Sequence, residues 1–139
     1  MKNRFFIILC FLPCCFACGP EFGTTYGKAY EFLVENHLAD RTVKIVPKPK
    51  TDFWISSNES YVVASGQKII IGSKVVYDEN KKATDIYQLD ENIALFDVYI
   101  DEIKQDKALS LRKFWEFSLG KVNNSGKYTL IINENILND

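Results

Sequence analysis

A chain of 139 residues has the length of one domain and can bury enough surface to fold without a metal or a disulfide. Its 17 basic and 18 acidic residues leave a formal net charge of -1, which gives no electrostatic reason to bind nucleic acid. The single histidine excludes a metal centre built from several histidines and argues against a Ser-His-Asp triad.

Residues 1–18 have the layout of a bacterial export signal. Two basic residues, Lys2 and Arg4, precede the apolar run FFIILCFLPCCFAC at residues 5–18. A membrane-spanning helix needs about 20 apolar residues, and the chain becomes polar and rich in glycine directly after this run. A cleaved signal peptide over residues 1–17 is therefore a better interpretation than a retained transmembrane anchor.

The end of the apolar run, Cys15-Phe16-Ala17-Cys18, resembles a lipobox, in which a signal peptidase cuts before a cysteine that becomes diacylated. Ala17 is the small residue expected before the cut, and Cys18 supplies the thiol. Cys15 and Phe16 depart from the usual leucine-like and small residues. The sequence therefore predicts lipidation of Cys18, which would hold the protein on a membrane without a spanning helix. Ordinary secretion with a free terminal thiol and an uncleaved anchor are the alternatives.

All cysteines of the chain lie in this leader, so the folded part is expected to contain no disulfide framework and no cysteine metal or redox site. They are Cys10, Cys14, Cys15 and Cys18. No cofactor is predicted either.

The chain after Cys18 begins with a flexible tether at residues 18–27, which contains three glycines and a proline. The first strand signal follows at residues 28–36, where Tyr30, Phe32 and Val34 alternate with Glu31, Leu33 and Glu35. Alternation resumes at residues 41–46. The two segments are expected to form an antiparallel hairpin that ends at Pro47.

Residues 61–64 and 68–77 are the next strand signals. Gly72 interrupts the second and predicts a bulge or a corner between sheets. The continuous run Ile69-Ile70-Ile71 indicates burial on both faces. Residues 78–82 read as a charged turn, and residues 83–92 fit either a helical turn or a loop.

The C-terminal third contains three more strand signals. Residues 95–100 alternate with Phe96, Val98 and Ile100 on one face. Residues 108–119 could be helical, but alternation favours a strand from Lys113 onward, and a turn at 123–126 precedes a last strand at 127–132. About seven short strands without a long amphipathic helix predict an all-β protein. The expected fold of residues 28–139 is an antiparallel, immunoglobulin-like β-sandwich.

Three segments together with the lipobox carry a resemblance to a known group of proteins. They are YEFLVENHLADRTVKIVPKP at 30–49, DIYQLDENIALFDVYIDE at 85–102 and GKYTLIINENIL at 126–137. In this combination the chain resembles the small uncharacterised lipoproteins of Bacteroides-type bacteria. The resemblance implies a membrane-tethered β-sandwich and brings no catalytic or ligand-binding residue with it.

Candidate chemical groups are sparse. His37 lies in a predicted turn, where a solvated side chain is the simpler interpretation than a metal or acid-base role. Asp97 and Asp101 share one face of a predicted strand, with other acids nearby. Carboxylates at this density could bind calcium or form a glycosidase pair, yet no EF-hand loop pattern is present and alternate acids usually mark the wet face of a strand. No metal site is predicted.

Aromatic residues are numerous, and most lie at inward positions that predict core packing. Trp54 differs because it stands between Asp52 and two serines, just after the segment with the prolines. A flat, exposed aromatic ring suits stacking on a sugar or contact with a protein. Trp54 is therefore the candidate ligand-binding residue.

These observations favour a non-enzymatic lipoprotein of the bacterial cell envelope, lipid-anchored to the outer membrane on its periplasmic face or at the cell surface. Its expected partners are the membrane, through acylated Cys18, and an envelope protein or a glycan. A carbohydrate-binding module on the same tether is the alternative, and a hydrolase is the weakest hypothesis.

Overall fold

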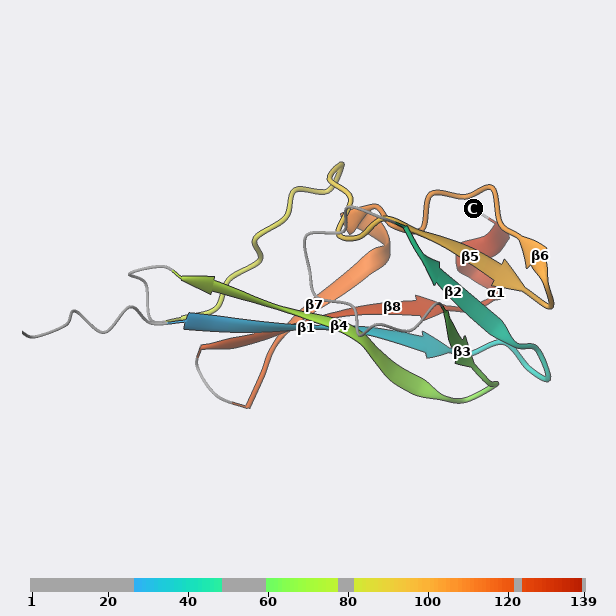
Figure 1. Ribbon diagram of the computed structural model, residues 1–139, viewed down its shortest axis with the longest axis horizontal. Helices are drawn as coiled ribbons and strands as arrows, with labels where there is room; N and C mark the ends of the chain where they lie inside the picture. The colour runs from blue at the N-terminus through green and yellow to red at the C-terminus, as the bar shows by residue number, and fades with distance from the viewer. Residues whose placement is uncertain (1–26, 49–59, 78–81, 122–123, 139) are drawn as a thin grey trace, which may run out of the picture.

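The computed structural model describes residues 27–48, 60–77, 82–121 and 124–138. Within these ranges the chain folds into two four-stranded sheets packed as a sandwich (Figure 1), which confirms the predicted all-β class. None of the helices in the described ranges is long and apolar enough to cross a membrane.

The strand order differs between the two sheets. The long sheet has the order β4-β1-β8-β7, with β4 at Lys68–Tyr77, β1 at Gly27–Asn36, β8 at Ser125–Ile132 and β7 at Trp115–Leu119. The short sheet has the order β3-β2-β5-β6, with β3 at Tyr61–Val63, β2 at Val43–Pro47, β5 at Phe96–Ile100 and β6 at Ile103–Lys104. A 3-10 turn, η1 (Arg112–Phe114), precedes β7, and a short helix, α1 (Glu134–Asn138), follows β8. α1 was not predicted from the sequence.

The centre of the long sheet joins the first and the last strand of the domain. β1 pairs with β8 in parallel, with Ala29 opposite Ser125 and Asn36 opposite Ile132. The other strand pairs are antiparallel. The long sheet is therefore mixed, where the sequence predicted antiparallel pairing throughout.

The expected hairpin between residues 28–36 and 41–46 is wrong, because β1 and β2 belong to different sheets. The buried side chain of Asn36 turns the chain out of the long sheet. Its Nδ2 donates to the carbonyl oxygens of Arg41 at 2.8 Å and Val63 at 2.9 Å, and its Oδ1 accepts from the amide of Leu38 at 2.9 Å. These three bonds hold the start of the short sheet against the end of β1.

The bulge predicted at Gly72 is confirmed. Phe32 lies opposite Gly72 and Leu33 opposite Ile70, so Ile71 is the extra residue on β4. Ile71 is buried, but Ile70 is 54% exposed. Burial of this run on both faces is therefore wrong, since only one face of the long sheet is covered by the sandwich core and neighbouring side chains point to opposite faces.

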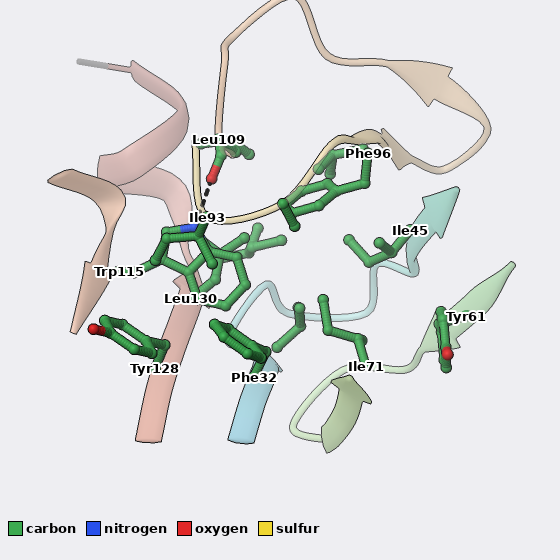
Figure 2. Close-up of a cluster of buried hydrophobic side chains, with 14 of the residues drawn as sticks. Phe32, Ile45, Tyr61, Ile71, Ile93, Phe96, Leu109, Trp115, Tyr128 and Leu130 are labelled. Atoms are coloured by element: carbon green, nitrogen blue, oxygen red, sulfur yellow. Dashed lines mark hydrogen bonds between the residues drawn. The ribbon is translucent and has the colours of Figure 1, made fainter. Parts of the chain in front are cut away.

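The core lies between the sheets and is centred on aromatic rings (Figure 2). Phe32 stacks nearly parallel on Tyr128, with ring centroids 5.4 Å apart. Trp115 meets Phe32 of the long sheet and Phe96 of the short sheet edge-on, at 6.4 Å and 6.0 Å. Its indole N–H donates to the carbonyl oxygen of Leu109 at 3.0 Å. Trp115 therefore links the two sheets and also satisfies its one polar group.

Of the turn predicted at 123–126, residue 123 lies outside the described residues, and Ser125 and Gly126 belong to β8 instead. Gly126 lies inside this strand. A Cβ atom there would come within 2.8 Å of the ring of Phe117 and 2.9 Å of the ring of Tyr30. Gly126 therefore leaves room for two core aromatic rings. In the sequence the same glycine resembled a turn signal.

Residues 82–95, called the strap below, cross the part of the long sheet that the short sheet leaves uncovered (Figure 1). Only an isolated bridge between Asn92 and Leu111 interrupts its irregular structure, so the loop interpretation of residues 83–92 is confirmed for the part described. Tyrosine hydroxyls fix the strap to the sheet: Tyr30 donates to the carbonyl oxygen of Thr84 at 3.1 Å, and the amide of Ile86 donates to the hydroxyl of Tyr128 at 2.8 Å.

Candidate functional site

The two residues named as sites from the sequence, Cys18 and Trp54, lie outside the described residues. Lipidation of Cys18 and ligand contact by Trp54 therefore stay predictions. The other candidates, His37 and the acids around Asp97, can be placed.

His37 lies at the surface just after β1. Its Nε2 is 2.8 Å from Glu35 Oε1, and the same carboxylate accepts from Lys68 Nζ at 2.9 Å. Hydrogen bonds from Lys68 and His37 lower the pKa of Glu35 below its usual value. Across residues 27–48, 60–77, 82–121 and 124–138, no group of three histidine, cysteine or acidic residues could hold a metal ion. His37 is thus part of a surface pair.

The acids near β5 are held apart in separate ion pairs. Asp97 lies between Lys48 at 2.7 Å and Lys104 at 3.2 Å, and Asp101 accepts from Arg41 at 2.8 Å. Hydrogen bonds from these basic groups lower the pKa values of both carboxyls. Both are therefore ionised at neutral pH and poorly suited to donate a proton as a general acid.

A pocket of about 320 Å³ opens beside Asp97, between β5 and the segment that follows β6. We call it the Asp97 pocket. Besides Asp97 its wall includes the two lysines that pair with it, Lys48 and Lys104, together with Gln105 and Ser110. Its volume lies at the lower end of the range for small-molecule sites. Its lining can hydrogen-bond a small polar ligand through donors and acceptors.

A partly buried ion pair fixes the strap and η1 to the long sheet. The side chain of Arg112 is 11% exposed and that of Asp85 is 36% exposed. Arg112 Nε donates to Asp85 Oδ2 at 2.9 Å, and Nη2 bonds the same carboxylate. Arg112 Nη1 donates to the carbonyl oxygen of Trp115, and the guanidinium carbon lies 5.4 Å from the ring centroid of Tyr128. One arginine thus joins the strap, β7 and β8.

Tyr128 completes this cluster. Its hydroxyl donates to Asp85 Oδ1 at 2.7 Å and accepts from the amide of Ile86. Burial raises the pKa of Asp85, but hydrogen bonds from Arg112 and Tyr128 outweigh it, so the net shift is downward. Burial and the bond to Asp85 both raise the pKa of Tyr128. At neutral pH the cluster therefore holds an ionised carboxylate, a guanidinium and a neutral phenol that satisfy one another, which is a structural arrangement.

The partnership of Asp85 with Arg112 and Tyr128 was not predicted from the sequence. The only available signal was the place of Arg112 between Leu111 and the aromatic-rich segment KFWEF at 113–117, where an arginine that becomes partly buried needs a carboxylate partner. Nothing in the sequence states which acid supplies it.

Comparison with protein-family models, with curated proteins and with solved structures gives no match for this chain. No residue role is therefore transferred from a relative. The similarity to small envelope lipoproteins stays a prediction.

Proposed function

We propose that this protein is a lipoprotein of the bacterial cell envelope that holds a non-enzymatic interaction domain on the membrane through acylated Cys18. One observation carries the proposal: a basic start and an apolar run end in Cys15-Phe16-Ala17-Cys18, with a small residue directly before the cysteine. The apolar run is too short for an ordinary spanning helix. Covalent acyl chains supply the attachment instead.

The pairing of the described polar groups supports a domain that binds and does not catalyse. Asp97 and Asp101 each form ion pairs with basic side chains. Within the described residues, the ring of His37 shares a hydrogen bond with the surface carboxylate of Glu35. A general acid-base mechanism needs two groups with pKa values near the working pH, directed at one position. The lowered pKa values of these carboxyls work against that role.

The proposed location is the outer membrane, either on its periplasmic face or at the cell surface. The segment after Cys18, Gly19-Pro20-Glu21-Phe22, contains one acid and favours neither face. Protease digestion of intact cells separates the two faces, since only a domain at the cell surface is cleaved without opening the outer membrane.

Cys18→Ser is expected to abolish incorporation of radiolabelled palmitate, because the thiol that accepts the diacylglycerol is lost. The amount of protein in the membrane fraction should fall for the same reason. Membrane fractionation together with the mass of the N-terminal peptide measures both effects. Cys15→Ser is the matched control and should still be acylated. An unchanged membrane fraction of unacylated Cys18→Ser protein would show that the apolar run itself is the anchor.

The Asp97 pocket favours a second candidate, a carbohydrate-binding module on the same tether, because its wall presents charged, amide and hydroxyl groups that suit sugar hydroxyls. Asp97→Ala should then reduce glycan retention in an affinity electrophoresis panel by about tenfold, since a bidentate polar contact is worth about 1.4 kcal/mol or more. The stability should change by about 1 kcal/mol or less, as for other exposed ion pairs.

Asp101→Ala is the matched control for this test, because Asp101 also forms an ion pair but does not line the pocket. Trp54→Ala tests the sequence prediction in the same panel. Equal retention by the wild type and Asp97→Ala would remove the pocket from the proposal. Unfolding of Trp54→Ala would assign Trp54 to the core.

A further inference from the structure

We infer that one end of the long sheet rests on the lipid surface to which Cys18 is anchored. This inference depends on the proposed lipid anchor and names the surface that the domain turns toward it. The end in question, called the tether end, contains the start of β1, the ends of β4 and β7 and the start of β8 (Figure 1, left). The strand register brings them together, with Gly27 opposite Tyr77 and Leu119 opposite Gly126.

Large apolar side chains are exposed at the tether end on both faces of the sheet. Tyr77 is 70% exposed, Val75 54% and Leu119 62%. Val75 and Tyr77 share one face, because they lie opposite Ala29 and Gly27. Leu119 lies on the other face, opposite Gly126, which pairs with the inward-facing Tyr30. Exposed apolar side chains therefore lie on both faces at this end of the sheet.

The chain that leads to this end limits how far it can lie from the membrane. The link from Cys18 to Gly27 spans at most about 30 Å when fully extended. A glycine-rich link of this length is expected to span roughly 17 Å on average. β1 itself runs for about 33 Å away from Gly27, at about 3.3 Å per residue. The tether end is therefore the part of the sheet nearest to the anchor along the chain, and the opposite end of β1 lies about 33 Å farther on.

The side chains present at this end have the chemistry of membrane interfaces. Tyrosine favours the boundary between headgroups and acyl chains, where its ring is dehydrated and its hydroxyl stays wet. Valine and leucine gain from losing contact with water. Lys121, exposed two residues after Leu119, can extend its charge to lipid phosphates. A lipid surface therefore fits this set of residues.

This orientation has a consequence for the rest of the domain. Figure 1 shows β5, β6 and α1 grouped at the side of the molecule away from the tether end. The Asp97 pocket, which lies beside β5 and β6, is then presented to the aqueous side. The tether end and the Asp97 pocket occupy different parts of the fold, so lipid contact at the tether end leaves the pocket accessible.

Single spin labels on the acylated protein test the inference in vesicles of phosphatidylethanolamine and phosphatidylglycerol. Labels are introduced by Tyr77→Cys, Val75→Cys and Leu119→Cys, with Val62→Cys and Ile103→Cys as matched controls on β3 and β6. Val62 and Ile103 are also exposed, at 59% and 67%. After cleavage of the leader, the one native cysteine is the acylated Cys18, so the labels attach only at the introduced thiols.

The measurement is the ratio of collision with oxygen to collision with a nickel chelate, which rises as a label enters lipid. We expect this ratio to be at least about threefold higher at the tether end than at the two controls, as for side chains buried in the interface. If the N-terminal peptide carries the acyl mass and the collision ratios are equal at all positions, the lipid contact is overturned but the anchor is not. A peptide without acyl mass would overturn the anchor as well. Dipolar broadening between tether-end labels, without a raised ratio, would assign this end to a second copy of the chain and overturn the lipid contact.

Discussion

Replacing Asn36 by alanine is expected to lower the free energy of unfolding by about 3–5 kcal/mol, a large share of the 5–15 kcal/mol typical of a domain. Asn36 is fully buried, and its amide satisfies two carbonyl oxygens and one backbone amide. Alanine removes all three bonds and leaves those groups without their partner in the interior. The midpoint and slope of urea unfolding measure the loss.

Two further variants sharpen this prediction. Asn36→Asp keeps an acceptor for the amide of Leu38 but directs a carboxylate at the carbonyl oxygens of Arg41 and Val63, so it should be at least as destabilising as alanine. Asn135→Ala, at an exposed position of α1, is the control and should change stability by less than about 0.5 kcal/mol. An Asn36→Ala midpoint equal to that of the control would contradict the assigned role of this corner.

Arg112→Met is expected to cost about 2–3 kcal/mol. Removing one partner of a fully buried ion pair costs about 3–5 kcal/mol, and the partial exposure of Asp85 lowers that figure. The variant removes the guanidinium donors from the carboxylate of Asp85, which keeps only neutral donors such as the Tyr128 hydroxyl, and from the carbonyl oxygen of Trp115. It also frees the strap, so amide hydrogen exchange should rise at Ile86 and its neighbours before the core strands exchange. Urea unfolding and hydrogen exchange measure the two effects.

The pH dependence of this loss provides an internal check. The pKa of Asp85 is lowered in the folded state, so its ion pair stabilises the domain above the unfolded-state value near 3.9 and ceases to do so as the pH falls through the folded value. Wild type and Arg112→Met should therefore converge in stability toward acid pH. Arg41→Met removes a solvent-exposed pair and should lower the stability much less than Arg112→Met does. A pH-independent loss in Arg112→Met would assign the effect to packing.

Much of the fold could be predicted from local alternation. The inward face of β5, with Phe96, Val98 and Ile100, is buried as expected, because a period of two directly reports which side of a strand is apolar. The bulge at Gly72 was also predictable, since a residue without a side chain in a strand marks a break in the ladder. Both signals are contained in a few neighbouring residues.

Strand pairing could not be predicted in the same way, because it depends on distant partners. The turn-like residues after β1 suggested a hairpin with β2, yet the side chain of Asn36 directs the chain to the other sheet. A buried asparagine and a turn asparagine look alike in the sequence. The parallel pairing of β1 with β8 likewise has no local signature.

The candidate sites show the same difference between local features, which the sequence predicts, and distant neighbours, which it does not. The positions of Asp97 and Asp101 on β5 and directly after it followed from alternation, but the basic residues that neutralise them come from other segments: Lys48 follows β2, and Arg41 precedes it. The Asp97 pocket depends on where the chain after β6 passes over β5. Such tertiary neighbours cannot be derived from spacing in one sequence.

The parallel pair of β1 and β8 also bears on how the domain reaches its native state. The strand nearest the leader completes its hydrogen bonds only when the last strand of the chain is available, because Ala29 pairs with Ser125. Pairings between such distant segments form late and slow folding. Under the proposed export, a chain that is still crossing the membrane lacks that partner, because β8 is the last strand to emerge. The long sheet would then be completed only after residues 125–132 have crossed.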